Sequence, residues 1–294
     1  VSDTLVFNNL TFGVGTGTAT FTLNDDLDIA GDLSVDYGTL ARGTQELFLA
    51  GALATGVDGF WSGVGSTTFD GSGTFAWSDS NPVSQSIGRV LIDGAPRTVT
   101  VGSDVRAESI RIGANDTLNA GGANTIAVAG NFTNENNFVA LSSTLAIVGD
   151  GTNAIVTTNG NNLSSFTAST TGGGTVAFTE SSVTLLGSFT IATGTVTLPT
   201  TELAVAGSFR NTGGAFAHNN SSVVFNGGGS NDIELNGTPF LNSFYDVTFS
   251  GTGDWTFLDT NATTTNTWTQ TNGSITLPNG TLTVGRDFTT SGAG

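Results

Sequence analysis

Hydrophobic and polar residues alternate along many short segments of the chain. Leu27 and Ile29 alternate with Asp28 and Ala30, and the same pattern continues over later positions. The apolar members of three such segments are Leu27, Ile29, Leu33 and Val35; Ile126, Val128 and Phe132; and Leu203, Val205 and Phe209. A period of two predicts β-strands with one buried and one solvated face. Segments with helical spacing are missing from the sequence, so we expect a helix content near zero.

Glycine falls between these predicted strands at regular places. The positions are Gly31, Gly51, Gly130, Gly187 and Gly207. A residue without a Cβ atom fits a bend between strands, so each glycine predicts a corner of the chain.

The chain resembles itself at a fixed, long offset. Matching residues at this 78-residue offset are Phe60, Phe138 and Phe216, and also Phe69, Ile147 and Phe225. The offset predicts four repeats, and the last of them is incomplete. The approximate ranges are 5–81, 82–160, 161–238 and 239–294.

A shorter period divides each repeat again. The segment Leu27–Leu33 resembles Leu47–Leu53, which lies 20 residues later. This length suits three short strands and three bends, which make one coil of a β-helix. We expect four coils of 19–20 residues per repeat, about fifteen coils in all. Phe60, Phe138 and Phe216 then recur on one wall, four coils apart.

The predicted fold is therefore all-β: one right-handed parallel β-helix, a solenoid, over residues 1–294. The right-handed sense follows the strong preference of parallel crossover connections. A row of β-sandwiches and a four-bladed propeller are the alternatives. A sandwich has no place for the 20-residue period, and a propeller requires a complete fourth repeat.

Composition and charge limit the classes of partner that we expect for this chain. It carries 24 acidic residues and seven Lys or Arg residues, for a net charge of −17. Such a chain repels nucleic-acid phosphates and anionic lipid surfaces. The sequence has no cysteine, and no apolar run is long enough for a transmembrane helix. We expect no nucleic-acid partner and no membrane insertion.

Three of the predicted turns carry a resemblance to known proteins. They are Leu203–Phe216, Ile126–Phe138 and Leu282–Gly292. They resemble the repetitive, filament-forming β-helical surface proteins of microbes, including adhesins and autotransporter passenger regions. The resemblance implies an exported protein that is displayed on a cell surface or assembled outside the cell.

One acidic cluster is the strongest candidate for chemistry. It consists of Asp25, Asp26, Asp28, Asp32 and Asp36. Some β-helical lyases and hydrolases use carboxylates on an exposed face, sometimes with calcium. The cluster does not recur in the other repeats, which favours a solvated surface over catalysis or a calcium site. The Gly227–Asp232 segment lacks the spacing of a calcium-binding β-roll, which favours a glycine-rich turn.

Single aromatic and imidazole side chains offer further candidates. His218 is the only histidine, so a zinc site is not expected, and a surface bend is the favoured interpretation. Four tryptophans could form a sugar-stacking surface, but they fall at different places in the repeat, which favours packing instead. They are Trp61, Trp77, Trp255 and Trp268.

Ten asparagines occupy N-glycosylation sequons, although chains rich in Asn, Ser and Thr create sequons by chance. They are Asn9, Asn115, Asn131, Asn162, Asn219, Asn220, Asn236, Asn261, Asn272 and Asn279.

These observations predict an extracellular structural glycoprotein, a rod-like subunit of a filament or of a cell-surface stalk or adhesin. We expect no enzymatic activity and no cofactor or metal. Copies of the chain are the expected partner, joined head to tail through its two ends, and cell-surface glycans are a second candidate. The alternative to head-to-tail joining is that further coils of a longer chain continue the stack. The expected assembly residues are Val6 and Phe7 at one end and Leu282, Val284 and Phe288 at the other. The alternative is a carbohydrate-binding or polysaccharide-degrading β-helix, of the tail-spike or lyase type.

Overall fold

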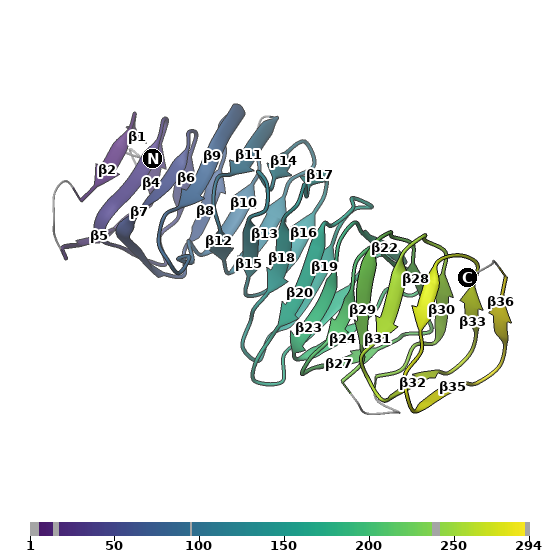
Figure 1. Cartoon of the computed structure of the whole chain (residues 1–294). Coiled ribbons are helices and arrows are strands. Elements are labelled where there is room, and N and C mark those ends of the chain that lie inside the picture. Colours follow the sequence, from purple (N-terminus) through teal and green to yellow (C-terminus); the bar gives the residue numbers. More distant parts are fainter. Residues whose placement is uncertain (1–5, 14–17, 95, 237–241, 292–294) are drawn as a thin grey trace. The chain divides into compact units, whose positions relative to one another are not determined.

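The structure is a computed structural model that describes residues 6–13, 18–94, 96–236 and 242–291. The chain folds into two compact units, Val1–Ser143 and Thr144–Gly294. In each unit the chain winds through short strands, and each strand pairs in parallel with a strand of the next coil (Figure 1). The described residues contain no helix. The predicted all-β parallel β-solenoid is confirmed.

Three sheets form the walls of the first unit. The first consists of β1 (Val6–Phe7), β4 (Leu27–Ile29), β6 (Leu47–Leu49), β8 (Ser66–Phe69), β10 (Arg89–Ile92), β13 (Ser109–Ile112) and β16 (Phe132–Asn134). The second consists of β2 (Leu10–Phe12), β5 (Leu33–Gly43), β7 (Leu53–Gly63), β9 (Gly73–Asp79), β11 (Arg97–Val101), β14 (Thr117–Asn119) and β17 (Asn137–Val139), and β3 (Thr20–Thr22) also pairs with β5. The third consists of β12 (Val105–Ala107) and β15 (Thr125–Val128).

The second unit has the same construction. One wall consists of β18 (Thr144–Ile147), β20 (Ser165–Ser169), β23 (Phe189–Thr193), β26 (Phe209–Asn211), β29 (Ser230–Glu234), β31 (Asp254–Phe257) and β34 (Ser274–Thr276). The next consists of β22 (Ser182–Leu185), β25 (Glu202–Val205), β28 (Ser222–Phe225), β30 (Asp246–Phe249), β33 (Trp268–Gln270) and β36 (Phe288–Thr290). The remaining strands are β19 (Asn153–Thr157), β21 (Thr175–Phe178), β24 (Thr195–Thr197) and β27 (Ala215–Ala217), and in the last coils β32 (Asn261–Thr264) and β35 (Thr281–Val284).

Several coils are longer than the sequence predicts. Thr98 pairs with Thr117, which matches the predicted coil length, but Gly73 pairs with Arg97, several residues further along the chain. Extra residues at corners lengthen individual coils, so the chain makes about 13 turns and not fifteen. The right-handed sense of winding stays a prediction.

The alternation of apolar positions gives the core. Leu27, Ile29, Leu33 and Val35 are all buried, and the polar residues between them face outward. Apolar side chains then stack from coil to coil, because paired strands bring equivalent residues together. The rings of Phe166, Phe189 and Phe209 follow one another in register at 5.3 and 5.1 Å. A single coil buries little apolar surface by itself, so this stacking is the main source of stability.

The glycines at the corners are required by close approach between coils. A Cβ atom on Gly51 would lie 2.2 Å from the carbonyl oxygen of Gly31. A Cβ atom on Gly207 would lie 2.7 Å from the carbonyl carbon of Gly187. Larger residues at these places would push neighbouring coils apart.

The 78-residue offset returns the chain to the same wall at some positions and not at others. Phe60 on β7 and Phe138 on β17 lie in one sheet, four strands apart, as expected. Within the second unit, Ile147 lies on β18 and Phe225 lies on β28, in different sheets. In the first unit Phe60 is 42% exposed, whereas Phe138 is 4% exposed. The expectation of one wall for Phe60, Phe138 and Phe216 therefore holds for the first two, whereas Phe216 on β27 lies in another sheet. Phe60 and Phe138 also differ in burial, because the observed coils vary in length. The repeat boundaries themselves stay a prediction; two of their starting positions, Leu5 and Pro239, lie outside the described residues.

Candidate functional site

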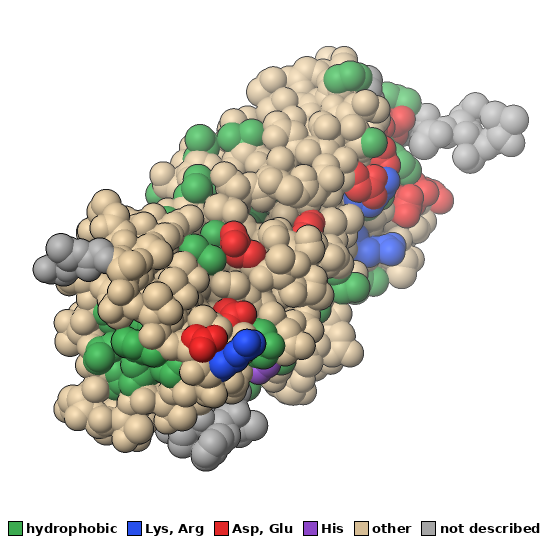
Figure 2. Space-filling model, turned by 90° about the vertical axis from the view of Figure 1, so that its right-hand side faces the viewer, with side chains coloured by type: hydrophobic (Ala, Val, Ile, Leu, Met, Phe, Trp, Pro, Cys, Tyr) green, Lys and Arg blue, Asp and Glu red, His purple; other side chains and the backbone are tan. Residues whose placement is uncertain are grey.

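The last coil of the second unit leaves its inward side chains partly uncovered. Phe288 on β36 is 52% exposed, whereas its partner one coil earlier, Trp268, is 1% exposed. Ile275, Leu282 and Val284 also face inward and are only half-buried. These three residues and Phe288 define the C-terminal end coil. Figure 2 looks onto the side where β33, β35 and β36 lie in Figure 1, and hydrophobic side chains gather there.

The first described coil of the first unit has the same property. Its inward side chains are only half-buried, although they pair with fully buried residues of the next coil. They are Phe7, Leu10, Phe12 and Phe21, which define the N-terminal end coil. Val6 is different: it pairs with Asp28 on the outer face and is 54% exposed.

Each end coil combines an apolar face with strand edges. The strands β34, β35 and β36 are the last of their sheets, and β1 and β2 are the first, among the residues that the structure describes. Unpaired edges of this kind accept further strands. Of the five expected assembly residues, Phe7, Leu282, Val284 and Phe288 lie on these inward faces, and Val6 does not. Association through them stays a prediction.

The acidic cluster contains hydrogen-bond acceptors that join neighbouring coils. The Asp26 carboxylate accepts a hydrogen bond from the Glu46 backbone N–H at 2.8 Å, and the Asp32 carboxylate accepts one from Ala52 at 2.8 Å. Asp36 accepts a bond from the Ser34 hydroxyl. Asp25 is exposed, and Asp28 lies on an outward position. Within the described part of the chain, no three His, Cys, Asp or Glu side chains are grouped to hold a metal ion.

A ladder of short polar side chains performs the same task in the second unit. The Ser165 hydroxyl accepts a hydrogen bond from the Ser188 backbone N–H at 3.2 Å, and the Ser188 hydroxyl accepts one from the Ser208 backbone N–H at 3.2 Å. The Ser208 hydroxyl in turn accepts one from the Asp232 backbone N–H at 2.9 Å. Each side chain satisfies a corner N–H group one coil further on. Sequence analysis missed this role, although the recurrence of Ser or Asp directly after the corner glycine is a signal for it.

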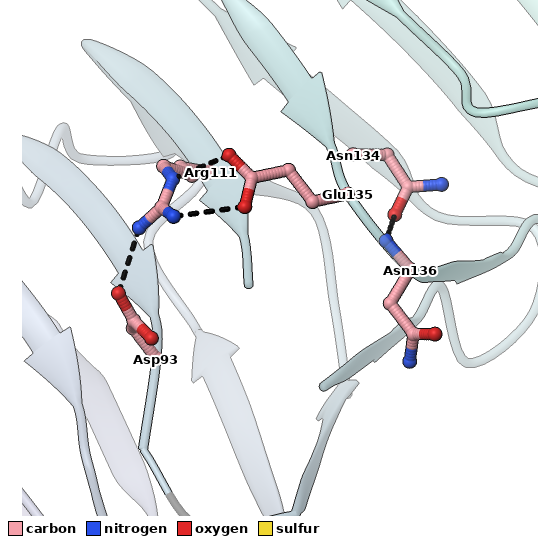
Figure 3. Close-up of polar contacts among 5 residues, drawn as sticks. All are labelled: Asp93, Arg111, Asn134, Glu135 and Asn136. Carbon is pink, nitrogen blue, oxygen red and sulfur yellow. Dashed lines mark hydrogen bonds and ion pairs between the residues drawn. The ribbon is translucent and has the colours of Figure 1, made fainter. Parts of the chain in front are cut away.

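Exposed arginines join the outer faces of several coils. Arg111 donates to the Asp93 carboxylate at 2.7 Å and forms two hydrogen bonds of 2.8 Å with Glu135 (Figure 3). Next to this group, the buried Asn134 side chain accepts a bond from the Asn136 backbone N–H at 3.1 Å (Figure 3). The Arg111 side chain is 41% exposed, so solvent screens these ion pairs.

Two other arginines are buried in the first unit. Arg42 is 1% exposed and donates to the carbonyl oxygens of Gly65, Ser66 and Ile87 and to the Thr67 hydroxyl, at 2.5 to 3.1 Å. Burial lowers the pKa of Arg42 to about 10. The guanidinium therefore holds together backbone segments from different coils.

Arg97 reaches across coils in the same way. It is 2% exposed and donates to the carbonyl oxygens of Leu49, Ala50 and Gly51 at 2.8 to 3.1 Å. Its guanidinium also lies 4.7 Å from the centre of the Phe75 ring. Both arginines occupy inward positions of the alternating pattern, which is the signal that could have identified them.

His218 follows β27 and lies beside a recess in the second unit. The recess has a volume of about 380 Å³ and is lined by Thr195, Ala215, Phe216, Ala217, His218, Asn219 and Ser243. The His218 ring packs against Tyr245, with 5.4 Å between the ring centres. Sequence analysis favoured a surface bend: His218 does begin a turn, but it is half-buried.

The four tryptophans are all buried. Trp61 is 8% exposed, and the others are 1% exposed or less: Trp77, Trp255 and Trp268. They pack in the core, so they do not form a sugar-stacking surface. The Gly227–Gly229 segment precedes β29, as expected for a glycine-rich turn, and a Cβ atom on Gly227 would lie 1.7 Å from the Ala206 carbonyl oxygen.

All ten sequon asparagines are exposed. This exposure is compatible with glycosylation but also with ordinary corner positions. For the Asn236 sequon, the following Gly237 and Thr238 lie outside the described residues.

Comparisons with protein-family models, curated proteins and solved structures give no match for this chain. The described residues contain no helix long and apolar enough to cross a membrane.

Proposed function

We propose that this chain is an extracellular structural protein whose β-solenoid extends by head-to-tail pairing with copies of itself, as in a filament or a cell-surface stalk. The observation that carries the proposal is the pair of end coils. Their inward side chains repeat the pattern of the buried core one coil away, but they are left half-exposed. Placement outside the cell follows the resemblance of the repeats to microbial surface proteins.

A second copy of the chain matches both end coils. The N-terminal end coil offers Phe7, Leu10 and Phe12, and the C-terminal end coil offers Leu282 and Phe288, all on inward positions. Covering a half-exposed apolar side chain of this size contributes about 1 kcal/mol. Four such residues at each end, together with backbone hydrogen bonds between edge strands, give a driving force for association.

The two ends differ, so pairing between them is heterologous and propagates. Two end-coil variants test this directly. Phe12→Asp disables the N-terminal end coil, and Phe288→Asp disables the C-terminal end coil. Leu186→Asp is the matched control, because Leu186 is 58% exposed but lies outside both end coils.

Sedimentation velocity and electron microscopy at about 100 μM, a concentration that detects weak association, give the readout. We expect the unmodified chain and Leu186→Asp to form extended oligomers. Each end-coil variant alone should be monomeric, and a mixture of the two should form a 1:1 dimer through the intact ends. A monomeric unmodified chain, or dimers of Phe12→Asp alone, would overturn head-to-tail pairing.

A further inference from the structure

A recess lies beside β27, the last strand of its sheet among the residues that the structure describes, after β19, β21 and β24. We call it the β27 recess. At this strand the Phe216 backbone N–H donates to the Asn242 side-chain oxygen at 3.0 Å.

The lining of the β27 recess combines apolar and polar groups. Ala215 and Ala217 supply methyl groups, whereas Phe216 is 3% exposed and its ring packs in the core against Phe209 and Phe244. Thr195, Asn219 and Ser243 bring hydroxyl and amide groups to the lining. A volume of about 380 Å³ lies within the range of about 300–1,000 Å³ that is typical of small-molecule sites.

The hydrogen-bonding state of the polar lining groups is fixed by neighbouring backbone. The Asn220 backbone N–H donates to His218 Nδ1 at 3.0 Å, so the neutral ring carries its proton on Nε2. Desolvation lowers the pKa of His218, which favours this neutral form. The Asn219 amide nitrogen donates to the Leu198 carbonyl oxygen at 3.1 Å, which leaves the amide oxygen as an acceptor.

The turn that presents these groups is conformationally unusual. Asn219 and Asn220 both have positive φ, 52° and 56°, a conformation that non-glycine residues rarely adopt. Two such residues in succession hold His218 and Asn219 next to the recess.

We propose that the β27 recess binds the pyranose ring of a neutral saccharide. A sugar ring offers an apolar face for the Ala215 and Ala217 methyl groups of the lining and hydroxyl groups that both donate and accept. The His218 imidazole donates, the Asn219 amide oxygen accepts, and the Ser243 and Thr195 hydroxyls do both. The described residues that line the recess include no carboxylate, lysine or arginine, so they offer no counter-ion to a charged ligand.

The only histidine of the chain supplies a specific reporter. Its imidazole C–H resonances can be followed by NMR while methyl glycosides of glucose, galactose, mannose and N-acetylglucosamine are added. We expect saturable shifts for at least one of them, with a dissociation constant on the order of 1–10 mM, as suits a ligand of this size. Glucuronate should bind more weakly than methyl glucoside.

Variants separate binding from folding. Saturation-transfer NMR, observed on the sugar, should show at least tenfold weaker binding for His218→Ala and for Ser243→Ala. Asn159→Ala is the matched control, because Asn159 also has positive φ (53°) in a turn of the same unit but does not line the recess. Its binding should stay unchanged within about twofold, the scatter of such measurements.

Three results would overturn the proposal. One is the lack of any saturable His218 shift with the four glycosides while circular dichroism shows folded protein. Another is glucuronate binding as tightly as methyl glucoside. The third is undiminished sugar binding by folded His218→Ala.

Discussion

The buried Arg97 should stabilise the fold far more than the exposed Arg111, although of the two only Arg111 forms close ion pairs. The Arg97 guanidinium donates three hydrogen bonds, all to backbone carbonyl oxygens, those of Leu49, Ala50 and Gly51. The Asp116 carboxylate is bonded instead to the Arg97 backbone N–H, which the substitution keeps. The perturbation is the same in both places: Arg97→Met and Arg111→Met. Methionine keeps a comparable apolar stem and removes the guanidinium.

The magnitudes follow from burial. A hydrogen bond from a charged donor contributes about 1.5–3 kcal/mol when both groups are buried. Three such bonds are lost in Arg97→Met, but the variant no longer buries a charge, which returns several kcal/mol. We expect a net loss of about 3 kcal/mol. Arg111→Met loses only solvent-screened pairs, so the expected cost is below about 1 kcal/mol.

Hydrogen exchange measured by mass spectrometry provides a local readout, which suits a solenoid because its coils can open separately. Peptides that cover Leu47–Leu53 should lose roughly a hundredfold in protection in Arg97→Met, as a loss of about 3 kcal/mol requires. The same peptides should change little in Arg111→Met. Equal losses of protection in the two variants would refute the view that buried hydrogen bonds from an arginine to backbone carbonyls stabilise the fold more than exposed ion pairs do.

Three other substitutions test the fold. Phe138→Asp places a charge at a site that is 4% exposed and should cost several kcal/mol, on the order of a domain's whole stability, in urea unfolding; an unchanged midpoint would contradict the inward assignment. Asp26→Ala should cost about 1 kcal/mol because the Glu46 N–H loses its acceptor, whereas Asp26→Asn should be nearly silent; equal costs would point to the charge instead. Desolvation and repulsion from Asp28 raise the pKa of Asp70 above its ordinary 3.8, so the folded state binds that proton more tightly and the carboxyl lowers stability as pH rises past this value. Asp70→Asn should therefore match the unmodified chain in urea at pH near 3 and exceed it near pH 7, the two sides of an ordinary carboxyl titration; lower stability near pH 7 would contradict this sign.

The inward and outward faces of the strands could be predicted from the sequence. Leu203, Val205 and Phe209 alternate with small or polar residues, and all three are buried. This succeeds because side-chain direction in a strand depends only on the parity of the position. The corner glycines were also located correctly, but their reason is the close approach of the previous coil and not a bend by itself.

The sequence also contained the end-coil residues, because an apolar residue at an inward position is recognisable wherever it falls. Their incomplete burial is a property of the stack. Leu282 and Phe288 resemble the core positions of other coils in every local respect, and only the structure shows that they are half-covered.

What the tertiary structure decided is which residues of different coils meet. The 78-residue offset predicted equivalent environments for Phe60 and Phe138, yet only Phe138 is buried. Two other features also depend on how the coils stack. Arg97 donates to the carbonyl oxygens of residues that lie two coils earlier in the chain, and a recess lies beside His218. Successive coils differ in length, and these small differences accumulate. Contacts between coils therefore depend on the sum of all preceding corners, and no local pattern records that sum.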